Sequence, residues 1–148
     1  MAIYGEIGIM NHESIPQDAD HARLLAAARD AQACAYAPYS NFPVGAAVLL
    51  SDGEIFAGCN VENASFGLTV CAERVAIFNA VAAGRMDIVA IAVVTAASTL
   101  CKPCGACRQV IAEFSRTDSP ILVLSICASG EVVTESIADL LPDTFALI

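Results

Sequence analysis

The fold is decided by the stretch Cys71-Ala72-Glu73-Arg74-Val75-Ala76-Ile77-Phe78-Asn79-Ala80-Val81-Ala82-Ala83. Its larger apolar residues recur with helical spacing and Gly84 follows it, so it predicts a helix that begins at a cysteine. A second motif, Pro103-Cys104-Gly105-Ala106-Cys107, opens another predicted helix over residues 104–114. Both cysteine motifs therefore fall where a loop enters a helix. The partial positive charge of a helix start lowers thiol pKa and favours thiolates.

The segments around these two helices predict an α/β protein. Helices are expected over residues 18–35 and 137–141, and strands over 44–50, 55–59, 88–94, 121–127 and 132–134. Ser51-Asp52-Gly53-Glu54 has the composition of a hairpin turn. The predicted order is helix, two strands, helix, strand, helix, two strands, helix. This order favours a three-layer α/β/α sandwich, in which helices cover both faces of a mixed five-stranded sheet.

Length and composition indicate one compact domain. The 148 residues divide into an N-terminal arm, residues 1–17, and a single domain, residues 18–148. Hydrophobic residues make up 57% of the chain, which predicts apolar surface covered in an oligomer. Met1–Met10 lacks the pattern of a signal peptide, and no run reaches the roughly 20 apolar residues of a spanning helix. We therefore expect no membrane partner and a cytoplasmic location.

Charge argues against a nucleic-acid partner. The formal net charge is −9, and the seven basic residues form no cluster along the sequence. A protein that binds polynucleotides normally carries a basic surface for the phosphates. The balance favours a small, uncharged substrate.

Seven cysteines without a secretory signal argue against a disulfide framework. Cys34, Cys59 and Cys127 lie in apolar or strand-like surroundings and are predicted to be small buried hydrophobic residues. Cys101 precedes Cys104 by three positions. If the other cysteines bind a metal ion, Cys101 is either an incidental neighbour of that ion or an additional ligand.

The remaining cysteines predict a zinc site. Cys71, Cys104 and Cys107 offer three thiolates, and three protein ligands leave the fourth position open, as in catalytic zinc sites. Glu73 is then a candidate proton shuttle, although an acidic residue in a first helical turn is also favoured by the helix dipole. A structural zinc site or a redox dithiol are the alternatives for the cysteines, and both leave Glu73 without a task.

Longer motifs surround these residues and carry a family resemblance. They are Ala37-Pro38-Tyr39-Ser40-Asn41-Phe42-Pro43-Val44-Gly45-Ala46-Ala47, Gly58-Cys59-Asn60-Val61-Glu62-Asn63-Ala64, Cys71-Ala72-Glu73-Arg74, Pro103-Cys104-Gly105-Ala106-Cys107-Arg108-Gln109-Val110 and Leu140-Leu141-Pro142. With these segments, over about residues 20–145, the chain resembles the small, zinc-dependent, homotetrameric cytidine deaminases. Phe66 stands where the family often has tyrosine.

The resemblance implies hydrolytic deamination of cytidine and 2′-deoxycytidine to uridine and 2′-deoxyuridine, with release of ammonia, in pyrimidine salvage. It implies one zinc ion per subunit on Cys71, Cys104 and Cys107, which lowers the pKa of a water toward about 7. Glu73 would move protons as base and then as acid. Arg74 would donate to a ligand sulfur and offset the negative charge of three thiolates.

The resemblance also implies the substrate contacts. Asn60, Val61 and Glu62 would hold the ribose, Phe42 would stack on the base, and the backbone N–H of Ala72 would bind the base carbonyl. In a homotetramer with 222 symmetry, Ala64, Phe66 and Phe145 would approach the active site of a neighbouring subunit. Packing of Phe42 and Phe145 within their own subunit, and a solvated strand end at Asn60 and Glu62, are the alternatives.

Three other functions stay open at this point. A deaminase of a nucleoside-like antibiotic such as blasticidin S would share the zinc motifs, although the Phe42, Asn60 and Glu62 segments argue against it. A nucleic-acid editing deaminase usually has histidine as its first ligand and a basic surface. A non-catalytic structural zinc module belongs to a different class of protein.

Overall fold

The computed structural model describes residues 18–147, and the sheet at its centre has the strand order β2-β1-β3-β4-β5. The parallel pair is β3 with β4, and the other three neighbouring pairs are antiparallel, so the sheet is mixed. The strands are β1 (Val44–Leu50), β2 (Ile55–Cys59), β3 (Ile88–Thr95), β4 (Leu122–Ile126) and β5 (Val132–Ser136).

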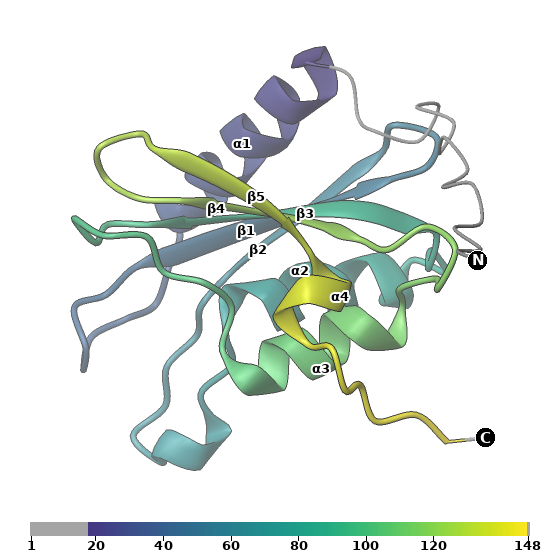
Figure 1. Ribbon diagram of the computed structural model, residues 1–148. Helices are drawn as coiled ribbons and strands as arrows, with labels where there is room; N and C mark the ends of the chain where they lie inside the picture. The colour runs from purple at the N-terminus through teal and green to yellow at the C-terminus, as the bar shows by residue number, and fades with distance from the viewer. Residues whose placement is uncertain (1–17, 148) are drawn as a thin grey trace, which may run out of the picture.

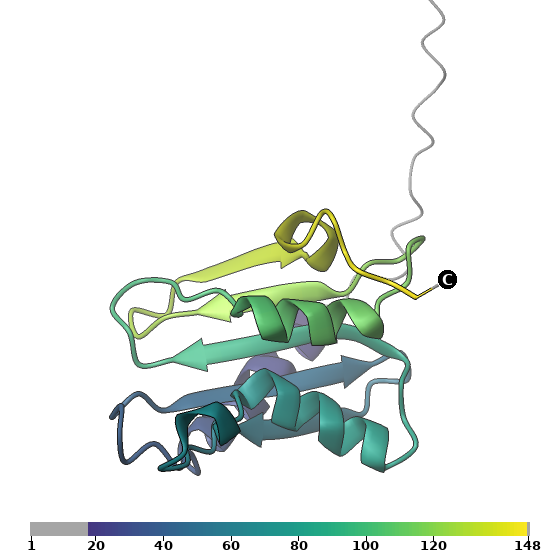
Figure 2. The ribbon, with the colours of Figure 1, turned by 90° about the horizontal axis from the view of Figure 1, so that it is seen from below.

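Helices cover both faces of this sheet. One face carries α1 (Asp18–Gln32), while α2 (Ala72–Ala82) and α3 (Gly105–Glu113) lie on the other, with α4 (Ile137–Leu140) beside α3 (Figure 1). Figure 2 shows α2 and α3 side by side across the strands, with α1 behind the sheet. The predicted three-layer sandwich and its five-stranded mixed sheet are confirmed.

Two glycines allow the helices to approach the sheet closely. A Cβ atom at Gly45 would lie 2.0 Å from the carbonyl oxygen of Ala28 on α1. A Cβ atom at Gly58 would lie 2.5 Å from the backbone nitrogen of Ala76 on α2. Any larger residue would force these helices away from the strands. Both glycines thus help to fix α1 and α2 on opposite faces.

The alternation of side chains along each strand divides the core in two. Ala46, Val48 and Leu50 of β1 pack beneath α2 and α3, whereas Ala47 and Leu49 of β1 pack against α1. The central strands β1 and β3 are buried on both sides, which explains why their sequences read as continuous apolar runs.

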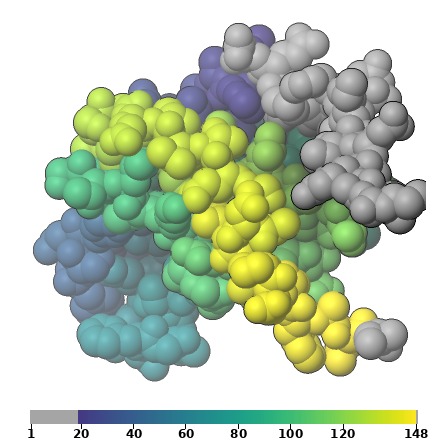
Figure 3. All heavy atoms as spheres, viewed as in Figure 1, coloured from purple at the N-terminus to yellow at the C-terminus, as the bar shows by residue number. Residues whose placement is uncertain are grey.

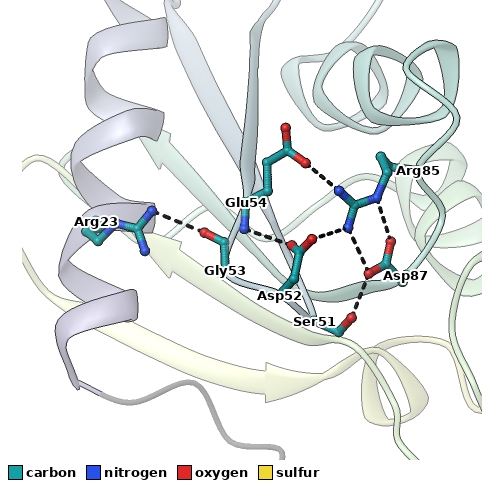
Figure 4. A network of polar contacts seen from close by, with 7 residues as sticks. All are labelled: Arg23, Ser51, Asp52, Gly53, Glu54, Arg85 and Asp87. Atoms are coloured by element: carbon teal, nitrogen blue, oxygen red, sulfur yellow. Dashed lines mark hydrogen bonds and ion pairs between the residues drawn. The ribbon is translucent and has the colours of Figure 1, made fainter.

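A polar network closes the end of the sheet where β1 turns into β2. Arg85, which follows α2, forms ion pairs with Asp52, Glu54 and Asp87, and the hydroxyl of Ser51 donates to Asp87 at 2.6 Å (Figure 4). These contacts tie the β1–β2 turn to the segment that enters β3. Because α2 begins at the other end of the sheet, the network lies far along the helix from the cysteine motifs.

The sequence predictions differ from the structure in several places. The first helix ends at Gln32, three residues before its predicted end, and a short 3₁₀ helix, η2 (Phe66–Leu68), was not predicted. Cys34 is exposed and Cys59 half-buried, so the prediction that they are buried is wrong, while Cys127 is buried as predicted. The predicted N-terminal arm, residues 1–17, lies outside the described residues.

Candidate active site

Three cysteine sulfurs meet where α2 and α3 begin. The Sγ atoms of Cys71, Cys104 and Cys107 all lie within 4.8 Å of one another, and those of Cys71 and Cys104 are 4.0 Å apart. Cys71 and Cys104 are the N-cap residues of α2 and α3, and neither side chain caps its helix. The sulfurs therefore stay available at two helix starts, whose partial positive charge favours thiolates.

The donor set fits a zinc ion. Tetrahedral coordination with Zn–S distances of about 2.3 Å requires sulfurs about 3.8 Å apart, close to the spacing of this cluster. Three thiolates leave one coordination position for a small ligand. Cys101 does not belong to the cluster, so the geometry favours the reading of Cys101 as a neighbour of the site.

Arg74 lies beside the cluster, on the first turn of α2. Its Nη2 atom donates to Cys71 Sγ at 3.7 Å and to the carbonyl of Thr69 at 3.5 Å. A hydrogen bond from Cys107 and the contacts with Arg74 lower the pKa of Cys71 to about 5. The hydrogen bond to Cys71, followed by burial, raises the pKa of Cys107 and so favours its protonated thiol. A bound dication would remove that proton as well, because coordinating thiols are deprotonated.

Glu73 is a buried carboxylate next to the sulfurs. It is 5% exposed, and burial, followed by the charge of Cys71, raises its pKa above the ordinary range of a glutamate. A carboxyl group tuned upward in this way exchanges protons near neutral pH more readily than an exposed one. The geometry thus suits Glu73 for moving protons at the metal.

A cavity of about 380 Å³ opens above the cluster, within the usual range for small-molecule sites. Eight of the predicted site residues line it or lie at its base. Those in its wall are Phe42, Asn60, Glu62, Cys71, Ala72, Glu73 and Cys104, and Cys107 lies beneath them among the sulfurs. The structure thus brings together residues from four separate motifs.

Asn60 holds one wall of this cavity. Its Oδ1 accepts a hydrogen bond from the backbone N–H of Val44 at 2.9 Å, and its Nδ2 donates to the carbonyl of Phe42 at 2.9 Å. Asn41, which directly precedes Phe42, has a left-handed φ of 52°, a conformation that asparagine tolerates. The amide of Asn60 therefore fixes the segment that presents the Phe42 ring.

Glu62 also binds the loop of residues 39–44, which contains Phe42. Its Oε2 accepts the backbone N–H groups of Tyr39 at 2.8 Å and of Ser40 at 3.3 Å. The Ser40 side chain, followed by these two backbone hydrogen bonds, lowers the pKa of Glu62. The carboxylate is thus ionised at neutral pH and adds negative charge to the mouth of the cavity.

Four predicted site residues lie outside the cavity of their own chain. Val61 is 43% exposed, and its backbone pairs with that of Val70. Ala64 is exposed, and Phe66, which is 77% exposed, packs edge-on against Tyr39 with ring centroids 6.2 Å apart. Phe145 is 69% exposed, on the C-terminal segment, whose yellow end extends away from the rest of the molecule in Figure 3.

Several cavity residues were not among the predicted site residues. They are Ser40, Val44, Thr69, Val93, Thr95, Cys101 and Lys102. Ser40 and Val44 lie inside a motif, and Cys101 and Lys102 directly precede one, so proximity in sequence was an available signal. Thr95 ends an apolar strand, and nothing in the sequence distinguishes it from a core residue.

Comparisons with known proteins agree with this geometry. The family described as "Cytidine and deoxycytidylate deaminase zinc-binding region" matches residues 18–123. A cytidine deaminase of Halalkalibacterium halodurans is 46% identical over 126 residues, which cover 85% of this chain and 94% of the relative. A cytidine deaminase of Mycobacterium tuberculosis is 40% identical over 130 residues, with 88% and 92% covered.

Solved structures show the same fold. The crystal structure of cytidine deaminase from Burkholderia pseudomallei superposes with a TM-score of 0.78 at 50% identity, covering 84% of this chain and 98% of that one. The fold and the three-cysteine cluster thus define a zinc-binding deaminase domain. The chain belongs to the cytidine and deoxycytidylate deaminase family.

Within residues 18–147, none of the helices has the length and apolar character needed to span a membrane.

Proposed function

We propose that this protein hydrolyses cytidine and 2′-deoxycytidine to uridine and 2′-deoxyuridine, releasing ammonia, as a zinc-dependent enzyme of pyrimidine salvage. The observation that carries the proposal is the buried Glu73 beside three convergent cysteine sulfurs, in the wall of one cavity. Relatives that share 40–46% of their residues with this chain are named cytidine deaminases. All seven cysteines are free thiols, which agrees with action in the reducing cytoplasm.

Glu73 carries the proton transfers in this proposal. A zinc ion on Cys71, Cys104 and Cys107 would supply a Lewis acid that makes water a nucleophile at neutral pH. Glu73 accepts a proton from the attacking water and delivers it to the pyrimidine ring nitrogen. It then takes the remaining proton from the new hydroxyl group on C4 and delivers it to the amino group, so that the C4–N bond breaks and ammonia leaves. Its raised pKa suits a group that acts first as base and then as acid.

The remaining wall residues place the nucleoside. Ala72 is the first residue of α2, so its N–H has no partner within the helix and can bind the base carbonyl. Phe42 stacks on the base, and Asn60 and Glu62 accept the ribose hydroxyls. Both polar side chains already hold the loop of residues 39–44, so ribose binding adds to or exchanges these contacts.

Charge favours a nucleoside over a nucleotide. Glu62 and Glu73 line the cavity. Lys102 also lines it, but its Nζ atom is paired with Oε1 of Glu135 at 2.6 Å. The chain carries a net charge of −9, which repels phosphate groups. We therefore expect neither CMP nor single-stranded DNA to be a substrate.

The active unit in this proposal is a homotetramer with shared sites. Phe66, Phe78 and Phe145 are 77%, 49% and 69% exposed, an apolar surface that a partner subunit would cover. Phe145 would reach a neighbour's substrate, and Ala64 and Phe66 would border a neighbour's site. Light scattering should give four times the 15.3 kDa chain mass, and a stable active monomer would contradict this assembly.

A substrate panel tests the proposed function. Ammonia release should be seen with cytidine and 2′-deoxycytidine, and not with CMP, single-stranded DNA or blasticidin S. Turnover of blasticidin S alone would identify the antibiotic-type deaminase instead. A zinc-loaded protein that releases no ammonia from any of them would leave the structural zinc module.

A further inference from the structure

The hydroxyl of Thr95 is a buried polar group that the fold itself does not use. Thr95 is the last residue of β3 and is 4% exposed. Among the described residues, its Oγ1 atom has no hydrogen-bond partner, and it has less than 1 Å² of accessible surface. Such an unpaired hydroxyl costs free energy, so its presence calls for a partner that arrives with a ligand.

The position of Thr95 points to the substrate cavity. Thr95 pairs with Val44 in the β1–β3 ladder, and both line the cavity together with Val93. Thr95 and Val93 are two residues apart, so their side chains share one face of the sheet. Val44 is the residue whose N–H is held by Asn60. Thr95 therefore lies in the cavity floor, next to the segment that presents Phe42.

The strand that ends at Thr95 does not itself require a hydroxyl group at this position. The preceding residues of β3, Ile88–Val94, are all apolar. Valine has nearly the shape of threonine and is at least as favourable in a buried strand. Staggered rotamers about χ1 exchange the positions of the threonine methyl group and Oγ1, so a contact with a ligand requires the rotamer that directs Oγ1 toward the cavity.

We infer that Thr95 is a specificity-determining residue, whose hydroxyl hydrogen-bonds the polar edge of the pyrimidine nucleoside bound in the cavity. This inference rests on the proposed function. A hydroxyl both donates and accepts, so it pairs with the amine-bearing substrate and with the carbonyl-bearing product. Thr95 thus adds one polar contact from the sheet to the contacts from the helix starts and the loops.

Ser125 provides a matched control within the same sheet. It lies on β4 opposite Val93, is 1% exposed, and its hydroxyl likewise has no partner among the described residues. It does not line the cavity. Removal of the Ser125 hydroxyl should therefore affect the fold in a similar way to removal of the Thr95 hydroxyl, without affecting the nucleoside.

The test compares Thr95→Val, Thr95→Ser and Ser125→Ala. Thr95→Val should keep its zinc and a thermal midpoint at or above the wild-type value without nucleoside. Its KM for cytidine should rise about 3- to 10-fold, the effect of one lost hydrogen bond. Its stabilisation by added uridine should fall correspondingly. Thr95→Ser and Ser125→Ala should stay within about twofold of the wild-type KM.

Wild-type KM and wild-type uridine stabilisation in Thr95→Val would overturn the inference. If Thr95→Val does not fold, Thr95→Ala and Thr95→Ser give the same comparison, because both lack the methyl group and only one lacks the hydroxyl. Equal KM values for that pair would also overturn it. Failure of the wild-type protein to convert cytidine would refute the proposed function instead, so the two outcomes are distinct.

Discussion

The Sγ atoms of Cys71 and Cys104 lie 4.0 Å apart, although 33 positions separate the two residues in the chain. The sheet brings them together, because α2 and α3 both begin at the same end of it, on the same face. Each cysteine stands at the N-terminus of its helix, where thiolates are stabilised. One structural device thus places both sulfurs where a cation could bind them.

Replacement of Cys104 by alanine should remove the metal. Elemental analysis of the wild-type protein should give about one zinc per chain, and Cys104→Ala should give little. Its thermal midpoint should also fall, because metal binding contributes to folding. Cys101→Ala is the matched control, since Cys101 lines the cavity outside the sulfur cluster, and it should keep its zinc. A fully loaded, active Cys104→Ala protein would contradict the ligand assignment.

Asn60→Ala should loosen the wall that carries Phe42. The substitution removes both hydrogen bonds of the amide and leaves the Val44 N–H without its acceptor, so the free energy of unfolding should fall by about 1–3 kcal/mol. KM for cytidine should rise as well. Asn79→Ala removes an amide–backbone bond to Ala57 that lies away from the cavity, and should leave KM unchanged. Similar KM values for the two variants would show that the Asn60 amide does not shape the site.

Asp87 should contribute to stability in a pH-dependent way. Hydrogen bonds from Arg85 and Ser51 lower its pKa to about 2. A carboxylate with a lowered pKa stabilises the fold at pH values above about 4, its ordinary range, and this contribution is lost as pH falls through about 2. The thermal midpoint of Asp87→Asn should therefore lie below that of the wild type at neutral pH, and the difference should shrink between about pH 4 and 2. A difference that stays constant over that range would argue against the ion-pair network of Figure 4.

Subunit mixing tests whether Phe145 acts on a neighbour's site. Phe145→Ala and Glu73→Gln subunits each carry one lesion, and if Phe145 acts in trans, mixed tetramers contain some sites free of both. Mixing should then restore part of the activity. Phe42→Ala with Glu73→Gln is the control, because Phe42 and Glu73 line the same cavity and no intact site can form. Equal activity in both mixtures would place Phe145 in its own subunit.

The sequence was sufficient for the layers and for the three cysteines whose sulfurs converge in the structure. Periodic apolar residues and turn residues identified the strands and α-helices that the structure describes within residues 18–147, because these signals are local. The cysteine spacing predicted a zinc site on Cys71, Cys104 and Cys107, and the structure brings their sulfurs within 4.8 Å of one another. The ends of the elements were predicted less accurately. The first helix, for example, ends at Gln32, three residues before its predicted end.

Features that depend on packing could not be predicted from the sequence. The exposure of Cys34 depends on where α1 ends relative to the sheet, which a local pattern does not encode. The two hydrogen bonds of Asn60 join residues 16 and 18 positions away. The unpaired hydroxyl of Thr95 is visible only once all its neighbours are placed, because in the sequence it simply ends an apolar strand.

The central claim is that Glu73 moves the protons in a zinc-dependent deamination of cytidine. The most direct measurement follows the ultraviolet change from cytidine to uridine with wild-type and Glu73→Gln proteins of equal zinc content. Glutamine keeps the size of the side chain but cannot transfer protons, so kcat should fall by at least about 10²–10⁴-fold. Near-normal turnover by Glu73→Gln with its zinc intact would contradict the account and assign the proton transfers to another group.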